Sequence, residues 1–458
     1  MYQIDFHHPI HVYFVGIGGI SMSGLAEVLL EEGFTVSGSD KQESALTKAL
    51  EDKGVRIFYG QRRSNITPDI DCAVFTSAIH PDNPEYAAVK ELSIPSLSRA
   101  ELLGQMMKNY KTSIAVSGTH GKTTTTAMIS EILLHADLDP TLSIGGILKS
   151  IGGNIRVGKS EYFVTEACEY TNSFLSLFPT TGIILNIEED HLDFFKDLDD
   201  IRNSFHEFAK LLPAGGTLVI NGDIPHVEQI TDSLSCEVVT FGTSSCDYVP
   251  SNITYDEFGH PSFDLKGPDG KTRSYALRVP GLYNVYNAAA AVATAELLGI
   301  DAQIIREALS DFKGTDRRFE YKGQMNGITI IDDYAHHPTE ITATLHAAQN
   351  YPHKTIWCVF QPHTYSRTKA FLPEFAEALS IADKIVLADI FAAREKDTLG
   401  ISSETLRKEI ENRGHECYYF PTFAEIENFL IENCTKGDLL ITMGAGDVVK
   451  IGENLLRK

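Results

Sequence analysis

Short apolar runs with strand character alternate with runs of helical periodicity over the first hundred residues. His11–Val15 is apolar and β-prone, Ile20–Glu31 has apolar positions at helical spacing, Thr35–Val36 returns to strand character, and Ala45–Lys53 is helical again. Alternation of this kind is typical of a parallel sheet whose strands are joined by crossover helices. The pattern therefore predicts a Rossmann-like α/β domain at the N-terminus.

Two more series of the same kind follow, so the chain as a whole is predicted to be α/β. Their expected strands are Ser113–Val116, Tyr162–Thr165 and Gly182–Asn186, and then one near Ile328, Thr355–Phe360, Lys384–Ala388 and Leu439–Met443. Between the two series, residues 242–280 are rich in Gly, Pro, Asp and Ser with alternating apolar positions. That composition indicates antiparallel hairpins.

A chain of 458 residues is too long for one hydrophobic core, since cores stop growing near about 250–300 residues. Composition shifts near Leu103–Lys111 and Lys313–Arg317 predict three domains, at 1–106, 107–313 and 314–458. The first and third are expected to be Rossmann-like. The middle domain is expected to combine a parallel sheet with a small antiparallel sheet.

Charge and composition narrow the class of protein. The formal net charge of -23 would repel a phosphate backbone, so nucleic acid is not an expected partner. No apolar stretch approaches the roughly 20 residues of a membrane span, and the N-terminus lacks a signal-peptide pattern, which predicts a cytoplasmic protein without membrane association. Seven scattered cysteines without a CxxC pair indicate free thiols and no zinc site.

The first predicted strand runs into a glycine loop that contains Gly16, Gly18 and Gly19, and a helix follows. Such a loop lets backbone amides approach a diphosphate at the positive end of the helix. Asp40 lies where these folds often bind a ribose hydroxyl. Ser21 stands where the dinucleotide fingerprint needs glycine, so three interpretations stay open: a nucleotide diphosphate site, a true NAD site, or a tight turn needed only for packing.

A second phosphate loop follows the strand Ser113–Val116 and precedes the helical run Thr125–His135. Strand, glycine loop, Gly-Lys-Thr and helix is the order required for triphosphate binding, although Val116 occupies the place of the first glycine in the standard P-loop. Lys122 is expected to neutralise the β- and γ-phosphates, and the Thr123 hydroxyl to reach magnesium. The expected ATP contacts in the loop are Gly118, Thr119, His120, Gly121, Lys122, Thr123 and Thr124.

Oxygen-rich partners for magnesium are expected at the ends of the next two strands, which converge on one crevice in parallel sheets. Glu166 follows Tyr162–Thr165, and His191 follows the acidic run of residues 188–190. The run itself is interpreted as a solvated turn in preference to a set of ligands. Histidine is an unusual magnesium ligand.

Taken together, several strings resemble the Mur ligase family of bacterial cell-wall synthesis. They are GTHGKTT at 118–124, EACEY at 166–170, Asp190-His191, GLYNVYN at 281–287, DDYAHHPTE at 332–340 and FQPHTYSRT at 360–368. The resemblance implies a three-domain enzyme: an N-terminal Rossmann-like domain for a UDP-sugar, a central P-loop-type ATPase domain, and a C-terminal Rossmann-like domain for an amino acid. The first glycine loop would then hold the pyrophosphate of UDP.

The resemblance also implies a reaction. L-alanine would be joined to the lactyl carboxylate of UDP-N-acetylmuramate through an acyl phosphate, with ATP and Mg²⁺ as cofactors and ADP and phosphate as products. The expected setting is peptidoglycan precursor synthesis in the cytoplasm, by a monomer or weak homodimer.

Site residues carried over from the resemblance fall into four groups. Those for ATP, besides the loop, are Asn284, Asn287, Arg318 and Asp333; those for the UDP-sugar are Gly16, Gly18, Gly19, Asp40 and Ser77; Tyr334, His336, His363 and Arg367 would shape the alanine site; the metal ligands would be Thr123, Glu166 and His191. Lys122, Glu166, His191, His336 and Arg367 are the expected catalytic residues. Alternative interpretations are a packed turn for His336 and His337, and a surface ion pair for Arg367.

Three positions depart from relatives as the resemblance presents them. Tyr283 stands where many have histidine, and Thr364 where many have arginine, which puts one adenine contact and one carboxylate contact in doubt. His206 lies near the position of a carbamylated lysine in some sister ligases, so no carbamate is predicted here.

Other functions remain open at this point. A recycling ligase that attaches a whole peptide to the same sugar would share both loops and differ in the amine pocket. A folate-adding ligase would not need the N-terminal glycine domain. An NAD-dependent oxidoreductase would explain the first loop but would leave the second, from Gly118 to Thr124, without a role.

Overall fold

The computed structural model describes residues 2–76, 79–243, 245–393 and 395–458. The chain divides into two units, Met1–Ile187 with Asp199–Thr240, and Glu188–Leu198 with Phe241–Lys458. Each unit contains two β-sheets.

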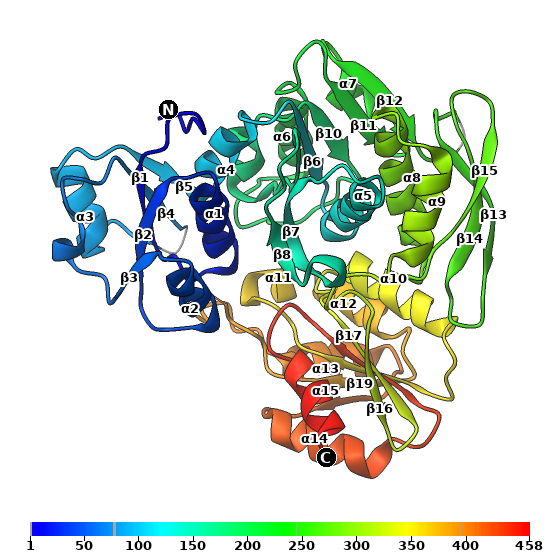
Figure 1. Cartoon of the computed structure of the whole chain (residues 1–458). Helices are drawn as coiled ribbons and strands as arrows, with labels where there is room; N and C mark the ends of the chain where they lie inside the picture. The colour runs from blue at the N-terminus through cyan, green and yellow to red at the C-terminus, as the bar shows by residue number, and fades with distance from the viewer. Residues whose placement is uncertain (1, 77–78, 244, 394) are drawn as a thin grey trace. The chain divides into compact units, whose positions relative to one another are not determined.

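Five parallel strands form the first sheet of the first unit, in the order β3-β2-β1-β4-β5. The strands are β1 (His11–Val15), β2 (Thr35–Asp40), β3 (Arg56–Tyr59), β4 (Cys72–Phe75) and β5 (Ser96–Ser98); the helices are α1 (Ile20–Glu31), α2 (Ala45–Asp52), α3 (Pro84–Glu91) and α4 (Arg99–Met107). Side chains alternate across β1, so that Tyr13 and Val15 pack with Ala88 and Val89 of α3. Figure 1 shows α3 on one side of this sheet and α1 and α2 on the other.

Seven strands form the second sheet, in the order β12-β11-β10-β6-β9-β7-β8. They are β6 (Thr112–Ser117), β7 (Thr141–Leu148), β8 (Gly153–Arg156), β9 (Tyr162–Glu166), β10 (Thr181–Ile184), β11 (Thr217–Asn221) and β12 (Glu237–Phe241). The helices of this part are α5 (Lys122–His135), α6 (Leu198–Ala209) and α7 (Glu228–Thr231). Because β6 lies between β10 and β9, with both pairings parallel, the loop after β6 emerges in the middle of the sheet edge.

Two glycines allow helices of the first sheet to pack closely against the second. A Cβ on Gly24 of α1 would lie 2.1 Å from Cγ1 of Ile155 in β8. A Cβ on Gly104 of α4 would lie 1.9 Å from the carbonyl oxygen of Ser176. Any larger side chain at these positions would force the two sheets of this unit apart.

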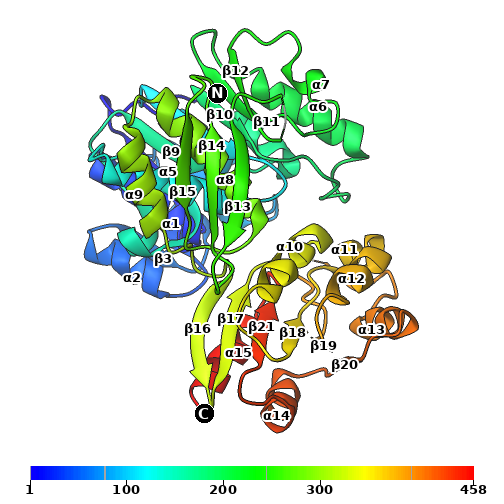
Figure 2. The same cartoon turned by 90° about the vertical axis from the view of Figure 1, so that its right-hand side faces the viewer.

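The second unit combines a small antiparallel sheet with a larger, mostly parallel one (Figure 2). The small sheet contains β13 (Val249–Tyr255), β14 (Pro261–Lys266) and β15 (Thr272–Ala276), followed by α8 (Leu282–Leu297) and α9 (Ala302–Asp311). It falls within residues 242–280, where the sequence predicted antiparallel hairpins.

Six strands form the larger sheet, in the order β16-β17-β21-β18-β19-β20. Within the described residues, only β16 runs antiparallel to its neighbour. They are β16 (Glu320–Met325), β17 (Ile328–Asp333), β18 (Ile356–Phe360), β19 (Lys384–Leu387), β20 (Cys417–Tyr419) and β21 (Leu439–Met443). The helices are α10 (Pro338–Gln349), α11 (Tyr365–Ala370), α12 (Leu372–Leu379), α13 (Ser403–Asn412), α14 (Phe423–Asn433) and α15 (Val449–Leu456). One face packs on α10, α12 and α13, and the other on α14 and α15.

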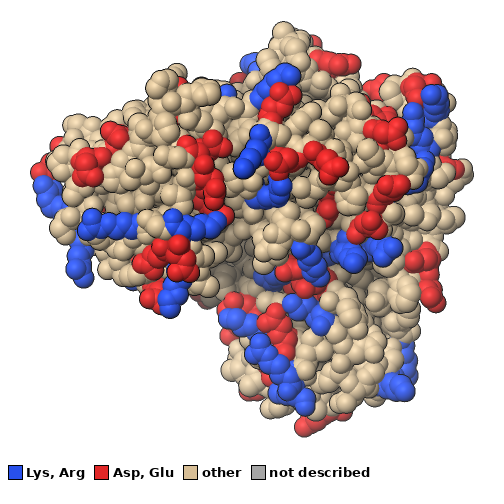
Figure 3. Space-filling model, viewed as in Figure 1, with Lys and Arg blue, Asp and Glu red and all other residues tan. Residues whose placement is uncertain are grey.

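These sheets confirm the predicted α/β class, while the domain boundaries at 106/107 and 313/314 stay predictions. Within the described ranges, no helix combines the length and apolar character needed to cross a membrane. The seven cysteines are free thiols. On the face drawn in Figure 3, acidic and basic side chains lie interspersed.

Candidate active site

The loop between β6 and α5 is held in shape by the segment that follows β10. The amide of Thr119 donates to the Asn186 carbonyl oxygen (3.1 Å), and the amide of His120 donates to Asn186 Oδ1 (2.7 Å). Asn186 Nδ2 donates back to the His120 carbonyl oxygen (3.0 Å). Gly118 (φ 140°) and Gly121 (φ 84°) adopt backbone conformations that other residues rarely adopt, so glycine is required at both turns of the loop.

Lys122 opens α5 and is buried against a carboxylate. Its Nζ lies 2.9 and 3.2 Å from the two oxygens of Glu169 and donates to the carbonyl oxygens of Gly118 and Thr119. The side chains are 17% and 4% exposed. Burial lowers the pKa of Lys122, but the Glu169 carboxylate outweighs burial, and the net effect raises it. A permanent cation is therefore placed at the positive end of a helix, which is suited to a phosphate.

Glu166, at the end of β9, lines a cavity of about 170 Å³. The amide of Gly145 donates to Glu166 Oε1 (2.6 Å) and fixes the carboxylate. Ser21 and Arg99, which belong to the first sheet and its helices, line the same cavity. The first unit therefore brings the start of α1, a guanidinium and an acidic group at a strand end around one small cavity of mixed polar and apolar lining.

Asp40, the acid expected near a ribose hydroxyl, contacts the N-terminal glycine loop. The amide of Gly18 donates to Asp40 Oδ2 (2.8 Å), and a Cβ on Gly18 would meet the same oxygen at 2.8 Å. Asp40 therefore supports the loop directly. The first turn of α1 has no side-chain cap, which leaves amide donors available for a diphosphate. Ser77, a predicted contact of the UDP-sugar, lies outside the described residues.

The residues predicted to surround the adenine and ribose lie at the start of α8 and near the end of β17. Asn284 Nδ2 donates to the Pro280 carbonyl oxygen (2.8 Å), and Asn287 Nδ2 donates to Asn284 Oδ1 (3.0 Å). A Cβ on Gly281 would lie 2.4 Å from the Tyr283 ring, so the ring of Tyr283 lies against this turn. Tyr283 is the position where many relatives are expected to have histidine.

Asp333 ends β17 and organises the turn that follows. Its oxygens accept from the amide of Ala335 (2.9 Å), the amide of Phe319 (3.2 Å) and the hydroxyl of Thr344 (2.9 Å). Burial raises the pKa of Asp333 to about 6, against the opposing effect of the Arg318 guanidinium and these hydrogen bonds.

Asp190 and Arg367 form a buried ion pair in the second unit. Arg367 Nη2 and Nε lie 3.0 and 3.2 Å from Asp190 Oδ1, and the side chains are 10% and 9% exposed. Burial raises the pKa of Asp190, but Arg367, His191 and His337 outweigh burial and hold it well below its usual range. The interpretation of Asp190 as part of a solvated turn is therefore wrong, as is the alternative of a surface ion pair for Arg367, because both side chains lie inside the fold.

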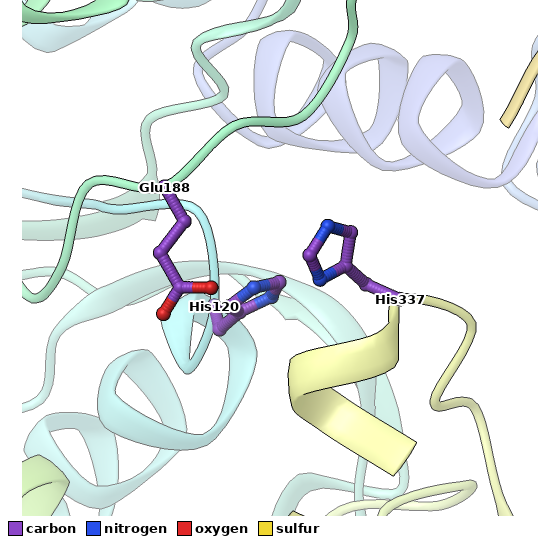
Figure 4. A group of neighbouring side chains, drawn as sticks. All are labelled: His120, Glu188 and His337. Carbon is purple, nitrogen blue, oxygen red and sulfur yellow. The ribbon is translucent and has the colours of Figure 1, made fainter. Parts of the chain in front are cut away.

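The rest of the acidic turn is tied to the start of α10. Thr339 Oγ1 donates to Glu188 Oε2 (2.6 Å), and His337 Nε2 lies 3.1 Å from the Glu189 carbonyl oxygen. His337 also caps α10 together with Glu340. Figure 4 shows the side chains of Glu188, after β10, and His337, at the beginning of α10. The packed-turn interpretation holds for His337, which has a structural role.

The predicted alanine-site residues Tyr334, His336, His363 and Arg367 come together in the second unit. The His336 ring lies 5.4 Å from the Tyr334 ring and 5.7 Å from the His363 ring, centroid to centroid. His363 in turn stacks on Phe391 (5.6 Å, 19° between planes). Phe391 was not singled out from the sequence, because nothing in its local pattern distinguishes it from a core aromatic.

The predicted metal ligands divide between the units, with Thr123 and Glu166 in the first and His191 in the second. A hydroxyl and a carboxylate are hard oxygen donors that fit Mg²⁺, and the imidazole of His191 is the less usual member. Arg99, Gly145 and Glu169 are site residues that sequence reasoning missed. Only Glu169 carried a signal, since it lies within the EACEY string.

His206 stands near the position where some sister ligases carry a carbamylated lysine. Its Nδ1 lies 2.9 Å from the Ile230 carbonyl oxygen, so one ring nitrogen is used in packing α6 against α7. The absence of a carbamate stays a prediction.

The fold and the site define a multidomain α/β enzyme. One sheet carries a phosphate loop on its central strand, another carries a second glycine loop, and a third carries a buried histidine–arginine cluster. Models of the Mur ligase family match three consecutive segments: the catalytic domain at residues 11–111, the middle domain at 116–295 and the glutamate ligase domain at 317–446. The chain belongs to the Mur ligase family.

Relatives match along the whole chain. It is 59% identical over 459 residues to the UDP-N-acetylmuramate--L-alanine ligase of Lachnospira eligens and 60% identical over 459 residues to that of Agathobacter rectalis, covering 100% of each chain in both cases. Among solved structures, the UDP-N-acetylmuramate-alanine ligase of Thermotoga maritima superposes with a TM-score of 0.81 at 29% identity, covering 98% of both chains. A murein peptide ligase of Psychrobacter arcticus gives 0.71 at 26% identity, again covering 98% of both chains.

Proposed function

We propose that this chain is an ATP-dependent ligase that joins L-alanine to the carboxylate of UDP-N-acetylmuramate and releases ADP and phosphate. The reaction would proceed through an acyl phosphate, in the synthesis of peptidoglycan precursors in the cytoplasm. The full-length identity of 59–60% to two ligases with this activity in their names supports the substrates. The observation that carries the chemistry is the cavity shared by Ser21, Arg99 and Glu166 in the same unit as the Lys122 loop.

The chemical problem is that a carboxylate is a poor acylating agent at neutral pH. Transfer of the γ-phosphoryl group to it creates a good leaving group, but two anions must approach each other. Lys122 would neutralise the β- and γ-phosphates, and the loop amides would orient them for in-line attack. Arg99, which lines the same cavity, would offset the charge of the incoming carboxylate.

Magnesium would be held by Thr123, Glu166 and His191, and would neutralise charge on the transferred phosphoryl group. The Gly145 amide keeps the Glu166 carboxylate directed into the cavity. The glycine loop before α1, which Asp40 supports, would hold the diphosphate of the UDP-sugar. Asn284, Asn287, Arg318 and Asp333 would surround the ATP. Tyr334, His336, His363 and Arg367 would receive the amino acid.

The test is a phosphate-release assay with the purified chain. Release is expected only when ATP, UDP-N-acetylmuramate and L-alanine are all present, with a product heavier by one alanyl residue and no change in nicotinamide absorbance. A tripeptide that replaces L-alanine at equal efficiency would instead identify a peptide-recycling ligase. Turnover without ATP, or without the UDP-sugar, would refute the proposal.

A further inference from the structure

The two histidines of the alanine-site cluster, His336 and His363, carry their ring hydrogens on different nitrogens. His336 precedes α10, and its Nδ1 lies 3.0 Å from the carbonyl oxygen of Tyr334 and 3.3 Å from Glu340 Oε2. A carbonyl oxygen can only accept, so Nδ1 carries the hydrogen. In neutral His336 the lone pair is therefore on Nε2.

Nε2 of His336 is available to a ligand. It makes no hydrogen bond to any residue in the part of the chain that the structure describes, and the side chain is 20% exposed. A carboxylate behind one ring nitrogen, with the other nitrogen free, is the arrangement by which a histidine becomes an oriented proton acceptor. Glu340 is itself fixed, because Oε2 also accepts from the amide of His336 (3.0 Å).

His363 is held in the opposite tautomer. Its Nδ1 lies 3.2 Å from Nη1 of Arg367, and a guanidinium can only donate. Nδ1 therefore accepts, and Nε2 carries the hydrogen. His363 is a donor toward a ligand, and protonation would break its contact with Arg367. Of the two rings, only His336 offers a free lone pair.

We propose, given the proposed ligase function, that His336 accepts the proton that the attacking amine loses, with Glu340 as its positioning residue. The incoming ammonium gives one proton to water, and its nitrogen lone pair forms a bond to the carbonyl carbon of the acyl phosphate. The carbon–oxygen bond to phosphate breaks, and the phosphate leaves with that electron pair. The second proton passes from nitrogen to Nε2, and the imidazolium then returns it to water.

Burial keeps His336 neutral before the reaction. Burial lowers its pKa to about 4; Glu340 and Asp190 oppose this, and Arg367 adds to it. Burial also lowers the pKa of the neighbouring His363 to about 4. Both rings are free bases at pH 7, so a proton acceptor is available throughout the physiological range, and the imidazolium that forms in the reaction is short-lived.

The test separates amine attack from activation of the carboxylate. In H336Q, the kcat for L-alanine ligation is expected to fall about 10²–10³-fold, which lies within the usual contribution of a general base, about 10²–10⁴-fold. Acyl phosphate formation, measured as the ATP-dependent hydroxamate of UDP-N-acetylmuramate with hydroxylamine, is expected to stay within threefold of the wild type. Added imidazole is expected to restore part of the ligation rate.

H363Q is the matched control in the same cluster. It is expected to raise the KM for L-alanine and to keep the fall of kcat at acid pH that the wild type shows. H336Q is expected to lose that fall. E340Q is expected to lower kcat about tenfold and to move the fall to lower pH, because it removes the charge that raises the pKa of His336.

Three outcomes overturn the assignment: ligation by H336Q within threefold of the wild type, an equal loss of hydroxamate and ligation in H336Q, or an unchanged fall of kcat at acid pH in E340Q. Failure of the wild-type chain to form hydroxamate or alanyl product would refute the proposed function instead, so the two failures are distinguishable.

Discussion

Replacing Lys122 with methionine removes a buried cation and keeps the length and apolar stem of the side chain. Lys122 Nζ lies 2.9 Å from Glu169, and the two side chains are 17% and 4% exposed. At this separation and an effective dielectric constant of about 20, the Coulomb attraction is roughly 5–6 kcal/mol, part of which offsets desolvation of both groups. Removing one partner of a buried pair typically costs about 3–5 kcal/mol, and we expect K122M to lose about 3 kcal/mol of stability.

A double-mutant cycle isolates this cause. K122M/E169Q leaves no unpaired charge, so it is expected to recover at least about 2 kcal/mol relative to K122M. The assay is urea unfolding monitored by far-UV circular dichroism. The free energy of unfolding of the first transition is compared for the wild type, K122M, E169Q and K122M/E169Q. Both variants that lack Lys122 should lose ATP-dependent phosphate release by more than about 10³-fold.

Stability and activity therefore respond differently to the second substitution. A coupling energy below about 0.5 kcal/mol would refute the buried-pair reasoning. Phosphate release by K122M near the wild-type rate would refute the role of Lys122 at the triphosphate.

Three further predictions follow from single contacts. G145A is expected to lower the kcat of phosphate release about 10–100-fold with little loss of stability, because its Cβ would lie 2.6 Å from the Glu166 carboxylate. G153A in the adjoining strand is the control: its Cβ would meet nothing closer than 3.8 Å, so it should retain full activity. D333N is expected to cost about 1–3 kcal/mol in thermal unfolding, because both carboxylate oxygens accept from donors and the amide must turn its NH₂ toward one of them, while an unchanged Tm would contradict this. The pKa of His336 is about 4 in the folded chain and about 6.5 in the unfolded chain, so the stability that the neutral ring contributes is complete above pH 6.5 and is lost as the pH falls through 4. The drop in Tm between pH 6.5 and 4 should therefore be smaller in H336Q than in the wild type. Equal drops would argue against a buried neutral ring.

Local order along the chain was sufficient to place the phosphate loop. A glycine loop between a β-strand and a helix, with lysine at the first helical position, is a short-range pattern, and the structure has it between β6 and α5. The helix begins at Lys122, three residues before the expected Thr125. The α/β class and the hairpins of residues 242–280 were readable for the same reason, since periodicity and turn composition are local.

Contacts between distant segments could not be read in this way. The pairing of Asp190 with Arg367 joins residues 177 positions apart, and the sequence around Asp190 looks like a solvated acidic turn. Nothing local to Arg99 or Gly145 places them around Glu166. The tautomers of His336 and His363 are set by near neighbours in the chain, the Tyr334 carbonyl oxygen and the Arg367 guanidinium, but the backbone conformation that brings each partner to its ring is decided by the fold.

Backbone periodicity and loop order thus determined the class of fold, the phosphate loop and the family resemblance, because each depends on neighbours in the chain. The tertiary structure decided which charges are buried together, which carboxylate holds Lys122 and which histidine has a free lone pair. The physical reason is that burial and the partners of buried charges are set by segments far apart in sequence, and that the fold fixes the loop conformations in which near neighbours meet a ring; burial and hydrogen-bond partners in turn govern pKa and chemical role.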